Sequence, residues 1–204
     1  MSNDFEVTGL FYEVNGFKLR KYLDIKRANS EGVIPDLMVV MMNPGASYPL
    51  DGIENNSTPS KAQPDTTQQQ IMKVMNGASF DCARILNLSD IRTPNSNDLY
   101  RFIQSQESKS VDHSIFSIDR KADLNQLFIK NVPVIFGWGV DSALIPLAKM
   151  AIESMGISNP LGMLKDNTKY SYYHPLPRIY AKQLEWVNHV TRQATRTSTP
   201  PRGA

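Results

Sequence analysis

The chain has 204 residues, of which 41% are hydrophobic and 21% are charged, and its formal net charge is +2. A chain of this size buries roughly 70% of its unfolded surface, so we expect one domain over residues 1–194 and a disordered basic tail over residues 195–204. The single cysteine, Cys82, excludes an internal disulfide framework, and without a Cys/His cluster we expect no metal site and no cofactor. The small positive charge permits a polyanionic partner without demonstrating one.

The sequence carries no signal that directs it to a membrane. Its first residues lack the basic and apolar regions of a secretory signal. No apolar run approaches the roughly 20 residues of a membrane span. We therefore expect a cytoplasmic protein that makes no membrane contact and acts as a monomer.

The N-terminal part predicts a hairpin and then a buried strand. Alternating apolar residues over 5–27 are interrupted by Asn15–Gly16, a strong signal for a two-residue hairpin turn. The apolar run Leu37–Met42 indicates a fully buried strand, and Pro44 and Gly45 end it abruptly. Residues 46–64 show no periodicity and predict a long loop, and loops of that length are often functional.

The rest of the chain predicts alternating helices and strands. Asp65 is an expected N-cap for a helix over residues 68–75. Further helices are expected near 98–106, 119–129, 142–155 and 180–194, and strands near 83–88, 132–136 and 170–173.

This alternation favours an α/β fold, namely a three-layer sandwich with a mainly parallel central sheet and an N-terminal β-hairpin. Three of the expected strands end in a polar residue, at Asn43, Asn87 and His174. Ligands of open α/β sheets bind at the carboxyl ends of the strands. These three residues therefore define one candidate cleft.

Four short motifs carry a family resemblance. They are Met42–Gly45, Leu86–Leu88, Phe136–Gly139 and His174–Arg178. In this order they resemble the uracil-DNA glycosylase superfamily, most closely its single-strand-selective monofunctional and mismatch-specific branches. The chain also resembles a little-characterised bacterial and phage domain family of unknown function. The likeness spans roughly residues 35–190.

The resemblance implies a DNA glycosylase that binds DNA, flips a pyrimidine nucleotide out of the stack and hydrolyses its N-glycosidic bond. Asn43 would hold the attacking water by hydrogen bonds, since an amide is essentially non-basic. His174 would donate a hydrogen bond to the departing base, a contribution of about 3–4 kcal/mol. Asn87 would read the base edge, Tyr48 would stack on the flipped base and Arg178 would fill the vacated space.

Departures from the family pattern bear on the substrate. Strict uracil enzymes have a tyrosine that blocks bulk at pyrimidine C5, where this sequence has Gly45. Leu176 replaces a serine, and Met41 stands where a glycine is usual. We therefore expect a pocket open toward C5 that admits thymine-sized groups or larger ones, such as the glucosylated hydroxymethylcytosine of some phage DNAs.

Each residue also has a plainer interpretation. Asn-Pro-Gly is an ordinary turn sequence, and a histidine before proline is often structural. Asn87 could simply end a strand, and Asp51 and Asp65 fit loop or capping roles better than acid/base roles. Scattered basic residues such as Arg178 usually form a solvated surface.

Three function classes stay open on the sequence alone. The first is a monofunctional DNA glycosylase that leaves an abasic site, because no lysine is placed as a Schiff-base nucleophile. The second is an inactive nucleic-acid-binding module on the same scaffold. The third is a hydrolase of free nucleosides or nucleotides. A glycosylase could serve either repair of deaminated cytosine or defence against phage DNA, and the open pocket favours defence.

Overall fold

The computed structural model describes residues 4–31 and 34–197, and its N-terminal hairpin confirms the prediction. Strands β1 (Phe5–Val14) and β2 (Phe17–Arg27) pair antiparallel from Phe5↔Arg27 to Val14↔Phe17. Asn15 and Gly16 both have positive φ, at 52° and 79°. A tight hairpin turn with this left-handed backbone matches the twist of its strands, and Asn-Gly is the dipeptide that adopts it most readily.

The sheet is mixed, so the expectation of a mainly parallel sheet is wrong. It adds β3 (Leu37–Met41), β4 (Ser60–Lys61), β5 (Cys82–Asn87) and β6 (Val134–Phe136) to the hairpin, in the order β4-β1-β2-β5-β3-β6. Strand β3 pairs parallel with β5 and β6, and the other pairings are antiparallel. The difference arises because β2 extends the sheet along β5, where Leu23 pairs with Ile85.

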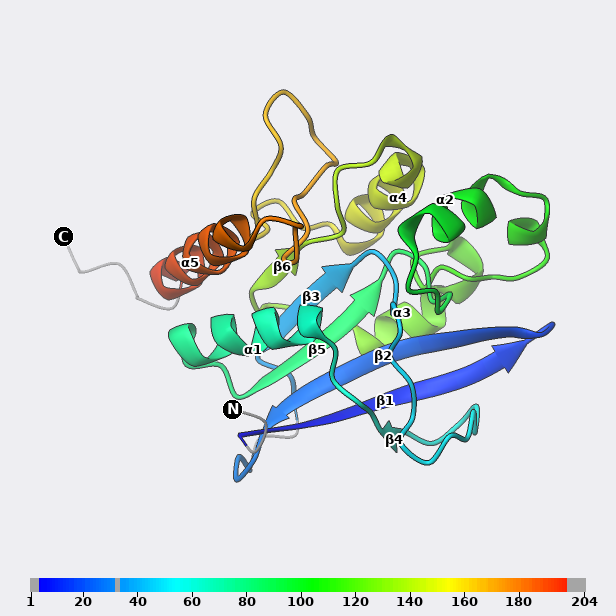
Figure 1. The fold of residues 1–204 in the computed structure, drawn as a ribbon, viewed down its shortest axis with the longest axis horizontal. Helices are drawn as coiled ribbons and strands as arrows, with labels where there is room; N and C mark the ends of the chain where they lie inside the picture. The colour runs from blue at the N-terminus through cyan, green and yellow to red at the C-terminus, as the bar shows by residue number, and fades with distance from the viewer. Residues whose placement is uncertain (1–3, 32–33, 198–204) are drawn as a thin grey trace.

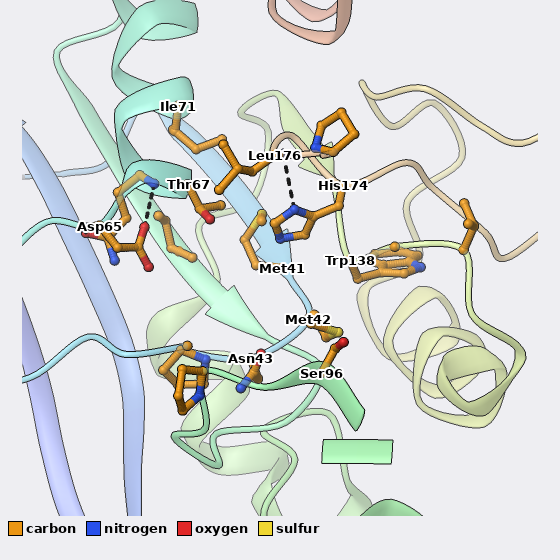
Figure 2. Close-up of a pocket in the computed structure, with 18 of the residues that line it drawn as sticks. Met41, Met42, Asn43, Asp65, Thr67, Ile71, Ser96, Trp138, His174 and Leu176 are labelled. Carbon is orange, nitrogen blue, oxygen red and sulfur yellow. Dashed lines mark hydrogen bonds between the residues drawn. The ribbon is translucent and has the colours of Figure 1, made fainter. Parts of the chain in front are cut away.

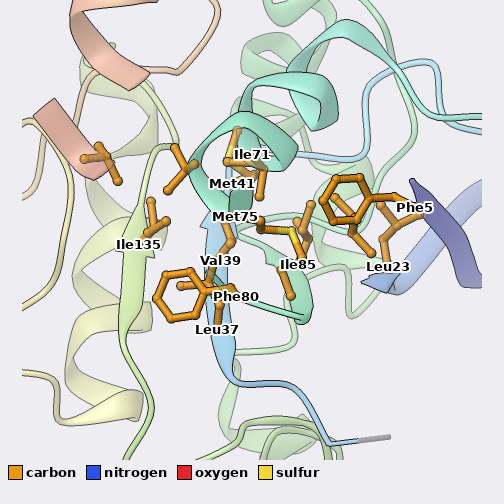
Figure 3. Close-up of a cluster of buried hydrophobic side chains, with 14 of the residues drawn as sticks. Phe5, Leu23, Leu37, Val39, Met41, Ile71, Met75, Phe80, Ile85 and Ile135 are labelled. Atoms are coloured by element: carbon orange, nitrogen blue, oxygen red, sulfur yellow. The ribbon is translucent and has the colours of Figure 1, made fainter. Parts of the chain in front are cut away.

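Helices cover both faces of this sheet (Figure 1). Helices α1 (Thr66–Ala78) and α5 (Tyr180–Thr197) pack on one face, and α2 (Ser96–Gln104), α3 (Lys121–Leu127) and α4 (Ile145–Met155) pack on the other. Strand β3 is buried on both sides, and its residues alternate between the two cores. Figure 3 shows the core under α1, where Val39, Met41 and Ile71 lie together.

Short elements and caps complete the connections. Three 3₁₀ helices span Glu107–Lys109, Ile118–Arg120 and Ser142–Leu144. Asp65 caps α1 as predicted, since its Oδ1 accepts the Gln68 N–H (2.8 Å) and the Gln68 Oε1 accepts the Asp65 N–H (3.1 Å). This reciprocal capping box fixes where α1 begins.

Two predictions about the C-terminal part need correction. Residues 170–173 form no strand; Tyr172 makes isolated bridges to Gly139 and Leu164 instead. The outer edge of β6 is met by Leu161, which bridges Ile135, so that edge is not open to residues 170–173. Helix α5 continues to Thr197, and the predicted disordered tail beyond it, 198–204, lies outside the described residues.

A membrane-spanning helix is not found in the described part of the chain. None of its helices is both long and apolar enough to cross a bilayer.

Candidate functional site

A cavity of about 600 Å³ opens at the carboxyl end of β3 (Figure 2). Most of its wall comes from five separate segments of the chain, which supply residues between 41–45, 65–71, 94–100, 138–140 and 174–178, and Arg20 of β2 and Ile85 of β5 complete it. A volume of this size lies within the range of roughly 300–1,000 Å³ typical of small-molecule sites. Asn43, Gly45, His174 and Arg178, four of the six predicted site residues, line it.

Asn43 is held in one orientation. Its Nδ2 donates to the backbone carbonyls of Ile91 (3.1 Å) and Thr93 (2.8 Å). These two bonds fix which amide atom is the nitrogen, because only the NH₂ group can donate to a carbonyl. Oδ1 accepts no hydrogen bond from any described residue, so it is the free acceptor of a half-buried side chain on the cavity wall.

His174 is neutral and presents a donor. Its Nδ1 accepts the backbone N–H of Leu176 at 3.1 Å, which places the ring proton on Nε2. Burial lowers the pKa of His174 to about 4, so the ring carries no charge at neutral pH. The imidazole can therefore donate one hydrogen bond without bringing a positive charge into the cavity.

The loop that carries His174 approaches the end of β6 closely. A Cβ on Gly137 would lie 3.2 Å from Cδ of Pro175 and 3.4 Å from Sδ of Met41. Contacts of that length are tighter than ordinary van der Waals packing. Gly137 therefore lets the His-Pro segment sit directly against the strand, and this contact sets the position of His174.

Two features of position 45, its backbone conformation and the space around it, favour a glycine there. Its φ is +64°, a left-handed backbone that glycine adopts without the usual steric cost. A Cβ at this position would meet only Oδ2 of Asp65, at 3.5 Å. The space beside Gly45 is thus open, and a carboxylate borders it.

Two predicted site residues do not line the cavity. Tyr48 is 48% exposed and lies outside the cavity. The tyrosine that lines the cavity is Tyr100 of α2, which is half-buried and has its hydroxyl 3.7 Å from Sδ of Met42. Asn87 is fully buried, and neither its Nδ2 nor its Oδ1 has a partner among the described residues. Asn87 shares a sheet face with Ile85, a cavity residue two positions earlier on β5.

Arg178 lies at the mouth of the cavity. Its side chain is exposed and forms no hydrogen bond or ion pair with a described residue. Asp51, one of the acidic residues near the first motif, lies away from the cavity and accepts the backbone N–H of Ile53 (3.0 Å). A local loop role therefore accounts for Asp51.

Sequence reasoning missed Arg20, whose side chain is only 2% exposed and lines the cavity. Strand β2 contains an extra residue, Lys21, because Leu10 pairs with Tyr22 and Phe11 pairs with Arg20. Such a bulge shifts the alternation of side chains by one residue. Because of the bulge, Arg20 lies on the same face of the sheet as Leu23, the face covered by α1 and α5. Without the bulge, the alternation of side chains counted back from Leu23 would place Arg20 on the opposite face.

The guanidinium of Arg20 has no bonded partner among the described residues. Its Nε and Nη1 are buried and make no hydrogen bond. Burial lowers the pKa of Arg20 to about 10, while Asp65 and Asp90 raise it from a distance. The group still carries a charge at neutral pH. Neighbouring Arg92 differs, since it pairs with Glu54 at 2.5 Å and donates to the Ser47 carbonyl at 2.7 Å.

Comparison with known proteins identifies a family but no relative of known activity. No curated protein matches the chain, and no solved structure matches it. One family model, described as "Protein of unknown function (DUF1643)", matches residues 18–176. Because the match covers well over half of the chain, the protein belongs to this DUF1643 family.

Proposed function

We propose that the protein is a monofunctional DNA glycosylase that hydrolyses the N-glycosidic bond of a pyrimidine and leaves an abasic site. One observation carries the proposal. Asn43 and His174, 131 positions apart in sequence, line the same cavity, and one has an unused acceptor (Oδ1) while the other has an unused neutral donor (Nε2–H). This is the pair of groups that a hydrolysis with a departing base requires.

The chemistry follows from what each group can do. As the bond between the sugar and the base breaks, its electron pair leaves with the base and positive charge develops on the sugar. The Nε2–H of His174 would stabilise the negative charge on the base, and a neutral ring does so without giving up its proton. Oδ1 of Asn43 would accept one hydrogen bond from a water molecule that attacks C1′. The water's surplus proton passes to solvent or to the released base.

Base binding and DNA contact rest on other side chains. Tyr100 replaces Tyr48 as the candidate for stacking on the flipped base, because it is the tyrosine that lines the cavity. Exposed Arg178 at the cavity mouth would fill the space left in the DNA stack. We also propose that the covered sheet is a distant variant of the uracil-DNA glycosylase sandwich, with the hairpin added at one side.

The proposed substrate is a C5-modified pyrimidine, such as glucosylated hydroxymethylcytosine, with uracil as the simpler alternative. The open space beside Gly45 supports this choice, since a Cβ there would have only one neighbour within 4 Å. A glycosylase with this preference would attack modified phage DNA, and the proposed biological role is antiviral defence.

The test measures base release from defined DNA. Single-stranded and duplex oligonucleotides containing uracil, 5-hydroxymethylcytosine or its glucosylated form are incubated with the protein, and abasic sites are detected as alkali-labile breaks. Asn43→Ala and His174→Ala should strongly reduce the rate at which the breaks form. Asn97→Ala and His189→Ala, which change residues outside the cavity, are the matched controls and should retain them.

Other outcomes point to the other function classes. Binding of these DNAs without any break would identify a nucleic-acid-binding module. Release of bases from free nucleosides, with none from DNA, would identify a nucleoside hydrolase. Breaks that persist in both cavity variants would show that the cavity is not the active site.

A further inference from the structure

The cavity is lined by two side chains of opposite charge, Asp65 and Arg20. Asp65 offers Oδ2 at 3.5 Å from the position of a Gly45 Cβ, while its Oδ1 is used in capping α1. Arg20 lines the same cavity, and Asp65 is the acidic group that acts on it most strongly. The two side chains form no ion pair within 4 Å, so each keeps hydrogen-bonding capacity for a third group.

Packing alone does not explain Arg20. An isolated charge taken out of water costs several kcal/mol unless it is paired and hydrogen-bonded. Arg20 is 2% exposed, and its Nε and Nη1 bond to no described residue. Buried polar groups of folded proteins nearly always find partners. Nη2 also bonds to no described residue, and it is not among the fully enclosed nitrogens of this cavity-lining side chain. A ligand in the cavity that bonds to Nη2 would give the guanidinium its missing partner.

The opposite charges of Arg20 and Asp65 limit the kind of group that can bind to both. A phosphate or carboxylate would accept hydrogen bonds from Arg20 but would be repelled by the Asp65 carboxylate. A methyl group would leave both polar groups without partners. A hydroxyl group fits both, because it can accept from the guanidinium and donate to the carboxylate.

We propose that Arg20 and Asp65 form a subsite that binds hydroxyl groups of a substituent on pyrimidine C5. This inference rests on the proposed function for the placement of the pyrimidine, and it adds a requirement that the substituent is polar and uncharged.

The experiment compares base release across a matched substrate series. The series contains 5-methylcytosine, 5-hydroxymethylcytosine and glucosylated 5-hydroxymethylcytosine in one DNA sequence. The protein should release the hydroxylated bases about 10- to 100-fold faster than 5-methylcytosine, the range expected for a hydrogen bond to a charged group. Arg20→Met and Asp65→Asn should reduce that ratio to below about 3-fold, whereas Asp98→Asn, a control in the first turn of α2, should preserve it.

Folding of the variants is measured alongside. Asn is as good an N-cap as Asp, so Asp65→Asn keeps α1 while removing the charge. Arg20→Met should melt at the same temperature as the parent protein or higher, because it removes a buried unpaired charge. A large fall in its melting temperature would indicate a structural role for Arg20, and Asp65→Asn then decides the test.

The outcomes separate this inference from the proposed function. Equal release of methylated and hydroxylated bases, or a ratio unchanged in both variants, would overturn the subsite and leave the glycosylase intact. If no DNA is cleaved, calorimetry with the glucosylated and the 5-methyl deoxynucleosides tests the subsite alone, and equal affinities would overturn it. Tighter binding of inorganic phosphate than of the glucosylated nucleoside would identify an anion site instead.

Discussion

Two buried arginines on opposite faces of the sheet have very different surroundings. Arg120, 9% exposed, donates to Asp90 at 2.6 Å and to Asp123 at 3.2 Å, and the hydroxyl of Tyr12 also donates to Asp90 at 2.8 Å. Arg20, 2% exposed, has no such partner among the residues described. The first charge is compensated within the fold, whereas the second belongs to a cavity-lining side chain with no bonded partner among the described residues.

The contrast extends to two histidines, His113 in the core and His174 on the cavity wall. His113 lies in the core with its Nδ1 2.9 Å from the Ser89 hydroxyl and its ring edge-on to Phe102. His174 uses one nitrogen internally and leaves the other to the cavity. Burial lowers the pKa of both histidines, so a shifted pKa does not by itself distinguish a catalytic residue from a structural one. The two residues differ in that only His174 has an unused ring nitrogen and lines the cavity.

The largest expected effect is on stability and tests the arginine contrast. Arg120→Met should lower the free energy of unfolding by about 3–5 kcal/mol, because it leaves Asp90 buried without its charged partner. Arg20→Met should not lower it. Urea unfolding of both variants measures the difference. Equal losses would mean that Arg20 is as structural as Arg120.

The histidine contrast predicts opposite changes in two assays. His174→Ala should reduce the rate of base release by about 10²–10³-fold while leaving the unfolding midpoint nearly unchanged. His113→Ala should retain the rate but lose about 1–3 kcal/mol of stability, since it removes the ring that bonds to the buried Ser89 hydroxyl and leaves that hydroxyl with the Ile91 N–H alone. Kinetics with a substrate that the parent protein cleaves, together with thermal melts, give both numbers. A loss of rate in His113→Ala at temperatures where this variant is folded would contradict a purely structural role for His113.

A smaller effect is expected at Asp65, which both caps α1 and borders the cavity. Asp65→Ala should cost about 0.5–2 kcal/mol of unfolding free energy, because the Gln68 N–H loses its acceptor. Asp65→Asn should cost clearly less, since the amide oxygen still caps the helix. Denaturant unfolding of the two variants checks the order, and equal losses would imply that the charge rather than the cap stabilises α1.

The smallest expected effect concerns the charge of His174, which should not change between pH 8 and about 5.5. His174 has a folded pKa of about 4, against about 6.5 in an unfolded chain, so folding disfavours its proton. Its stabilising contribution is present above pH 6.5 and is lost as the pH falls toward 4. The ring resonances of His174 should stay constant by NMR from pH 8 to about 5.5. The same histidine in urea-unfolded protein should titrate near 6.5, and a midpoint near 6.5 in the folded protein would refute the neutral, buried ring.

Local patterns in the sequence located the elements well. Apolar runs located β3 and β5 to within a residue, Asn15–Gly16 located the hairpin turn, and Asp65 located the start of α1. These features depend on neighbours in the chain, which is why a sequence reveals them. Strand pairing depends on distant contacts, so the antiparallel addition of β2 to β5 could not be predicted from periodicity.

The candidate site was predictable only where a polar residue follows an apolar or aromatic run. Asn43 follows β3 in this way, and His174 follows the aromatic residues 170–173, which form no strand; both residues line one cavity. Tyr48 was wrongly placed in it because a loop sequence does not reveal which way its side chains point. Tyr100 and Arg20 were missed because an amphipathic helix and an alternating strand look the same whether their polar groups face water or a cavity.

The face of the sheet on which Arg20 lies depends on the number of residues in β2, because Lys21 is an extra residue there. Deleting Lys21 would restore strict alternation and carry the guanidinium to the opposite side of the sheet, away from Asp65. Among relatives, a one-residue gap at this point would therefore mark proteins that lack the proposed subsite even when they retain an arginine next to the gap. If the subsite exists, insertions and deletions in this hairpin would sort the family by the substituents that its members accept.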